Sequence, residues 1–98
     1  MSKELVRGLT APNDAEVLST SEFLTEAFVQ ISNISVDLSL TNESTETGEV
    51  LDGMSDILEL MRSILILKNI DPKALFEVAV QRGAQEGSFM DKKAITKE

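Results

Sequence analysis

The stretch "GEVLDGMSDILELMRSILILKNIDP", residues 48–72, predicts a long amphipathic helix at the centre of a small protein. Its apolar residues recur at steps of three and four, which is the period of an α-helix. They are Val50, Leu51, Met54, Ile57, Leu58, Met61, Ile64 and Leu65. We predict a helix from about Glu49 to Lys68. Beyond Arg62 the stretch is apolar nearly all round, so it needs cover on more than one side, and a second copy of the chain is the expected cover.

The segment before it, "STSEFLTEAFVQISNISVDLSL" (residues 19–40), predicts a second long helix. Ser19 and Glu22 have the S-x-x-E spacing of a capping box. The apolar stripe that follows is Leu24, Phe28, Ile31, Ile34 and Leu38. The last part is rich in Ser and β-branched residues, which are weaker helix formers. A strand over residues 34–40 therefore stays open as an alternative.

The expected architecture is all-α, in one domain over residues 1–98. A short polar connection, residues 41–48, joins the two long helices into an antiparallel helical hairpin. A third helix begins with Asp71 as N-cap and Pro72 at its first position and runs to about Arg82. Residues 1–18 form an N-terminal arm in which Leu5, Val6 and Leu9 are available for docking, and residues 86–98 form a basic C-terminal tail. We expect the domain to assemble as a helical-bundle homo-oligomer, a homodimer or homotetramer.

Composition narrows the possible chemistry. The 98 residues contain neither cysteine nor histidine, which excludes thiolate and imidazole catalysis and the usual zinc sites. A metal would need oxygen ligands, which favours Mg²⁺ or Mn²⁺. A net charge of −8 argues against a nucleic-acid partner. The apolar runs are too short to span a membrane, and the N-terminal residues do not resemble a signal peptide. We therefore expect a soluble, cytoplasmic protein.

Acidic and amide side chains line one edge of each long helix. On the first helix these are Glu26, Gln30, Asn33 and Asp37, and on the second they are Asp52, Asp56 and Glu59. In an antiparallel hairpin Asp37 approaches Asp52, and Asn33 approaches Asp56. Carboxylates this close repel each other unless a cation neutralises them, and a divalent ion that also holds a phosphate chain would do so. The alternative interpretation is that both edges are solvated borders of the apolar stripes.

These motifs together resemble the MazG-like, or phosphoribosyl-ATP pyrophosphohydrolase-like, all-α nucleotide pyrophosphatases. The resemblance is carried by the arm "KELVRGLTAP" (residues 3–12), by "LDGMSDILELMRSILILKNID" (residues 51–71), which places Asp56 at the family's metal-binding aspartate, and by "RGAQEGSFMDKK" (residues 82–93). It covers most of the chain. Two motifs depart from the family pattern: the first motif falls on Asn33, Ile34 and Asp37 instead of three glutamates, and in the second Gly53 replaces the glutamate three residues before Asp56.

The resemblance implies Mg²⁺-dependent hydrolysis of a nucleoside triphosphate to its monophosphate and pyrophosphate, a house-cleaning activity. It implies Asp37 and Asp56 as catalytic residues, and Arg82, Lys92 and Lys93 as phosphate-binding residues. The implied metal ligands are Asn33, Asp37, Asp52 and Asp56. A rival register pairs Glu22 and Glu26 with Glu49 and Asp52. The replaced glutamates also leave an alternative function open, a catalytically inactive dimeric helical module that binds a nucleotide or a protein partner.

Overall fold

The computed structural model describes residues 3–97 and contains three α-helices in this range. They are α1 (Thr20–Ser39), α2 (Thr47–Leu67) and α3 (Pro72–Glu86), preceded by a single 3₁₀ turn, η1 (Gly8–Thr10). The prediction of an all-α chain is confirmed, because no strand occurs between residues 3 and 97. The alternative strand over residues 34–40 is wrong. Continued burial of one face of α1 against α2 outweighs the weak helix propensity of this segment.

The ends of α1 and α3 are set by local hydrogen bonds that the sequence predicted. The Ser19 hydroxyl accepts a hydrogen bond from the backbone N–H of Glu22 at 3.1 Å, which caps α1. Asp71 caps α3 by accepting from the backbone N–H of Lys73 at 3.0 Å, with Pro72 at the first helical position. Each cap satisfies a backbone donor that a helix start would otherwise leave free. α3 ends at Glu86, about one turn beyond the predicted end.

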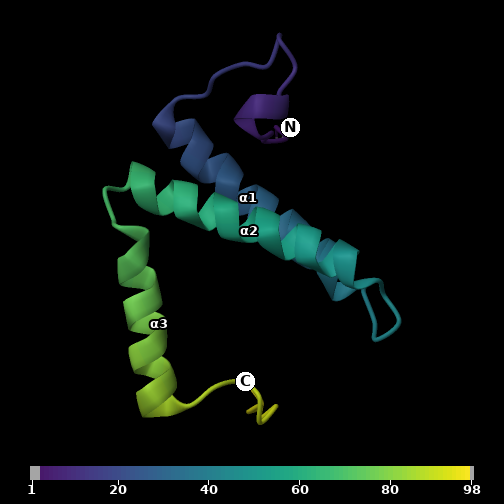
Figure 1. Ribbon diagram of the computed structural model, residues 1–98, viewed down its shortest axis with the longest axis vertical. Coiled ribbons are helices and arrows are strands. Elements are labelled where there is room, and N and C mark those ends of the chain that lie inside the picture. The colour runs from purple at the N-terminus through teal and green to yellow at the C-terminus, as the bar shows by residue number, and fades with distance from the viewer. Residues whose placement is uncertain (1–2, 98) are drawn as a thin grey trace.

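Helices α1 and α2 lie side by side and antiparallel, joined by the loop over residues 40–46 (Figure 1). The two helices pack tightly at Gly53, where a Cβ atom would lie 2.8 Å from Cδ2 of Leu38. Leu38 thus occupies the space that any larger residue at position 53 would need. The contact also fixes the register of the hairpin, because residue 38 of α1 lies level with residue 53 of α2.

Helix α3 turns away from the end of α2 and leaves the hairpin largely uncovered (Figure 1). Among the described residues only Ala27 and Ile64 are buried. The radius of gyration is 16.3 Å, whereas a compact domain of this length has about 13 Å. The single chain therefore encloses very little core of its own. No helix within residues 3–97 combines the length and apolar character needed to cross a lipid bilayer.

Candidate functional site

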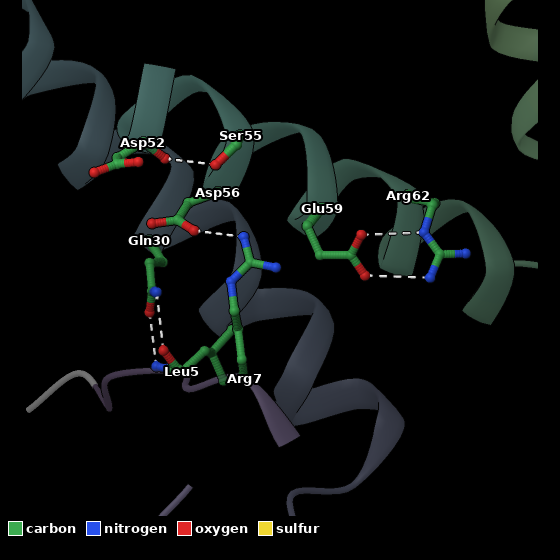
Figure 2. A network of polar contacts seen from close by, with 8 residues as sticks. All are labelled: Leu5, Arg7, Gln30, Asp52, Ser55, Asp56, Glu59 and Arg62. Atoms are coloured by element: carbon green, nitrogen blue, oxygen red, sulfur yellow. Dashed lines mark hydrogen bonds and ion pairs between the residues drawn. The ribbon is translucent and has the colours of Figure 1, made fainter. Parts of the chain in front are cut away.

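The N-terminal arm packs along the polar edge of α1. The Gln30 side chain binds the backbone of Leu5 twice: its Oε1 accepts from the Leu5 N–H at 2.7 Å, and its Nε2 donates to the Leu5 carbonyl at 3.0 Å (Figure 2). A third hydrogen bond joins residues that come slightly earlier in the arm and in α1: the Lys3 N–H donates to the Glu26 carboxylate at 3.0 Å. Lys3 Nζ lies 2.6 Å from Glu16 Oε1, and the hydrogen bond with Glu16 is the main reason why the pKa of Lys3 is raised. Half of the predicted α1 edge therefore faces the arm.

The arm also reaches α2 through Arg7. Nη2 of Arg7 donates to Oδ1 of Asp56 at 2.6 Å (Figure 2). The hydrogen bond with Asp56, followed by the charge of Asp56, raises the pKa of the guanidinium. Both side chains stay accessible, with 56% and 49% of their surfaces exposed. Asp56 is therefore neutralised by a cation that can still move, because an exposed ion pair is only weakly stabilising.

A second ion pair borders the first. Glu59, one turn after Asp56, accepts from Nε and Nη2 of Arg62 at 3.1 and 3.2 Å (Figure 2). The hydrogen bond from Arg62 is the largest cause of the lowered pKa of Glu59, which the charge of Arg7 lowers further. Asp52, Asp56 and Glu59 thus form one acidic edge of α2, with two guanidinium groups against it. We call these three residues the α2 acidic edge.

The arm, α1 and α2 line a cavity of about 760 Å³ that is open to solvent and lies next to the α2 acidic edge. Its walls mix apolar side chains, including Leu5, Phe23 and Leu60, with the polar groups of Arg7 and Gln30. A second hollow of about 660 Å³ lies beside it, lined by Arg7, by charged and polar residues of α2 and by Leu58. Cavities of ~300–1,000 Å³ with a few polar groups are the usual size for small-ligand sites.

The predicted metal ligands lie at the expected height but do not gather into one cluster. From the Leu38–Gly53 contact, Asp37 and Asn33 each lie within about 3 Å of the height of Asp52 and Asp56 along the helix axis. Asp37 and Asn33 are nonetheless exposed, because each residue step turns a helix by about 100° and carries them away from the contact line. In residues 3–97, no three Asp, Glu, Cys or His side chains are grouped closely enough to hold a metal ion.

The rival register is incompatible with this hairpin. Glu26 lies level with residue 65 of α2, about 24 Å along the axis from Glu49. Both glutamates of α1 in this register are already bound to Lys3. The Glu26 carboxylate accepts a hydrogen bond from the Lys3 N–H, and the Glu22 carboxylate lies 3.8 Å from Lys3 Nζ. These glutamates help to hold the arm.

The three predicted phosphate-binding residues belong to α3 and to the tail that follows it, not to the elements that line the cavity. Nε of Arg82 donates to Glu86 one turn later on α3, at 2.7 Å. Lys92 and Lys93 belong to the tail that follows α3 (Figure 1). Within one chain these three cations do not line the cavity or the adjacent hollow.

Sequence reasoning did not assign Arg7, Gln30 and Glu59 to a site. One local signal for Arg7 exists: in an extended segment alternate residues share a side, and Lys3, Leu5 and Arg7 are the residues that contact the helices. The prediction that the apolar residues Leu5, Val6 and Leu9 dock the arm is only partly confirmed. Leu5 is half-buried, but Val6 is 52% exposed and Leu9 is completely exposed.

Comparison with known proteins adds no family assignment, because no family model, curated protein or solved structure matches this chain.

Proposed function

We propose that this protein is a Mg²⁺-dependent nucleoside triphosphate pyrophosphohydrolase whose site lies between the N-terminal arm and the α2 acidic edge. The observation that carries the proposal is the pairing of a cation, Arg7, with Asp56 beside a ligand-sized cavity. Asp56 is the residue that the family resemblance marks as the metal-binding aspartate. In the absence of a metal ion, the guanidinium of Arg7 supplies the positive charge that balances this carboxylate.

The residues present fit a Mg²⁺ ion that arrives with its nucleotide. Mg²⁺ commonly takes one or two carboxylates from the protein and completes its shell with water and substrate phosphates. Asp52 and Asp56, one turn apart on α2, would supply those carboxylates. When bound, the ion would polarise the phosphate oxygens and activate water. Asp37, exposed at nearly the same height on α1, is close enough in register to assist only if its side chain turns toward α2.

We further propose that the functional unit is a homo-oligomer. The outer side of α2 carries two apolar residues at helical spacing, Leu51 and Met54, that are 61% and 57% exposed. We call them the α2 outer stripe. Exposed apolar stripes of this kind are normally covered, and a chain with so little core gains most from covering them with a second copy.

A second candidate function is favoured by one specific observation. Between residues 3 and 97, no three carboxylates are grouped closely enough to hold a metal ion. A nucleotide-binding or protein-binding helical module without hydrolysis would not need such a cluster.

The experiment is to measure pyrophosphate release from a panel of canonical and modified nucleoside triphosphates with Mg²⁺ or Mn²⁺. The proposal expects release that disappears in Asp56→Asn and persists in Glu22→Gln, which removes a carboxylate of the rival register. Release that survives Asp56→Asn would refute this site. Absence of release from the native chain at high concentration would favour the binding module.

A further inference from the structure

Two neighbouring hollows share the same three side chains, Arg7, Asp56 and Glu59. The Arg7–Asp56 ion pair therefore stands at the boundary between the larger cavity and the charged hollow beside it. A ligand that fills both hollows must pass this pair. The chemistry of the two hollows differs, and that difference indicates which part of a ligand each would take.

The larger cavity is suited to a nucleoside. Phe23, half-buried on α1, gives it an aromatic side chain, and Leu5 and Leu60 add apolar surface. An aromatic ring can stack on any nucleobase, which makes such a contact tolerant of sequence or base type. Gln30 and Ser63 supply polar groups on the same walls. The volume of about 760 Å³ is ample for a base and a sugar.

The neighbouring hollow is suited to a phosphate chain with its metal. It is lined by three carboxylates and two guanidinium groups, together with one hydroxyl and one apolar side chain. These residues are Asp52, Asp56, Glu59, Arg7, Arg62, Ser55 and Leu58. Arg62 is held by Glu59 through two hydrogen bonds. Arg7 has one hydrogen bond to Asp56, so it is the guanidinium that can change partner at lower cost.

The backbone of the arm is held independently of the Arg7 side chain. The two hydrogen bonds between Gln30 and Leu5 anchor the arm two residues before Arg7. The guanidinium can therefore leave Asp56 while the arm remains in place. A metal ion held by Asp56 would compete with the guanidinium of Arg7 for the same carboxylate, and the released guanidinium would lie in the same hollow as the triphosphate. Guanidinium groups bind phosphate oxygens in a forked geometry that lysine cannot reproduce.

From this arrangement we infer that Arg7 is a phosphate-binding residue, which holds Asp56 in the free protein and moves to the phosphate chain when a metal–nucleotide complex enters. The inference rests on the proposed function for the class of ligand. It differs from the family expectation, which assigns this role to Arg82, Lys92 and Lys93. The N-terminal arm then belongs to the site itself, as the wall of the nucleoside cavity and the source of a phosphate-neutralising charge.

The test is calorimetric binding of α,β-methylene analogues of ATP, GTP, CTP and UTP with Mg²⁺, which do not hydrolyse between the α and β phosphates. Arg7→Gln is compared with Arg82→Gln, the rival assignment, and with Lys73→Gln, which removes one positive charge from α3. Arg7→Lys keeps the charge without the fork. Because the side chains of Arg7, Lys73 and Arg82 are all exposed, helix content by circular dichroism should be unchanged in all four variants.

We expect Arg7→Gln to weaken binding of the preferred triphosphate analogue by about tenfold or more. Binding of the corresponding monophosphate should change by less than about threefold, because it presents fewer phosphates. Arg7→Lys should recover part of the loss, and the two α3 variants should match the native chain. Native affinity in Arg7→Gln, or a larger loss in Arg82→Gln, would overturn the inference while leaving nucleotide binding intact.

Failure of the proposed function has a different signature. If the native chain binds none of the analogues at millimolar concentration, both the nucleotide ligand and the role of Arg7 are refuted. If the native chain binds but releases no pyrophosphate from hydrolysable triphosphates, only hydrolysis is refuted, and the affinities still decide the assignment of Arg7.

Discussion

Nη2 of Arg7 and Oδ1 of Asp56 lie 2.6 Å apart, although 49 positions separate the two residues in the sequence. This ion pair joins the N-terminal arm to the central helix at the aspartate that we propose as a metal ligand. It explains why acidic groups border the apolar face of α2: one of them holds the arm in the free protein. The same pair places a movable cation at the proposed site.

Gln30 should be the main anchor of the arm. Replacing Gln30 with alanine removes both hydrogen bonds to Leu5 and should raise amide exchange at Leu5 by about tenfold or more. Trypsin should also cut faster after Lys3 and Arg7. Asn33→Ala is the matched control, since Asn33 lies on the same edge of α1 and is exposed. An unchanged exchange rate at Leu5 in Gln30→Ala would contradict the described docking of the arm.

Glu59 should titrate below its ordinary pKa of 4.5, because Arg62 stabilises the carboxylate. A lowered pKa in the folded state means that the contribution to stability is complete above the unfolded value and is lost as the pH falls through the folded value. Carbon-detected NMR of the Glu59 carboxyl group measures the pKa directly. Arg62→Gln should raise it toward 4.5, whereas Arg82→Gln, which removes the same charge from α3, should leave it unchanged. Equal pKa values in all three proteins would refute the pairing.

Placing a glutamate at position 53, as the resemblance to the MazG-like proteins would suggest, should destabilise the protein. A Cβ atom there lies 2.8 Å from Leu38, so the longer glutamate side chain must displace Leu38 and separate the helices. Such overpacking costs about 1–3 kcal/mol in the free energy of unfolding. Gly53→Ala is the control, since its gain in helix propensity of about 1 kcal/mol offsets a small movement of Leu38. Urea denaturation of both variants decides the matter, and a Gly53→Glu protein as stable as Gly53→Ala would show that α1 and α2 are not this close.

The α2 outer stripe should lie at the interface between copies. Sedimentation equilibrium of the native chain should give a dimer or a tetramer, and Met54→Asp should shift it toward the monomer because a buried, unpaired carboxylate opposes association. Leu9→Asp is the control: Leu9 is equally apolar and fully exposed, but it lies on the arm. A native chain that remains monomeric at high micromolar concentration would exclude the homo-oligomer.

The sequence determined the helical elements because their signals are local. The period of the apolar residues, the Ser19 cap and the Asp71–Pro72 start each act within a few residues, and each is found in the structure. The hairpin follows from the short polar connection between two long helices, and the height of Asp37 beside Asp52 follows from that hairpin.

The candidate site was decided by tertiary structure. The contacts of the arm join residues that lie far apart in the sequence, and no pattern within a helical turn relates them. Lys3 and Leu5 bind side chains on α1 that lie 23 and 25 positions away, and Arg7 binds Asp56 on α2, 49 positions away. The arm has no helical period, and its contacts are hydrogen bonds and exposed ion pairs, which leave no apolar pattern in the sequence. The packing role of Gly53 was also not predictable from the sequence. There it stands where the resemblance would place a metal ligand, whereas in the fold it provides the space that Leu38 fills. Such a packing contact depends on the residue opposite and not on the neighbours along the chain.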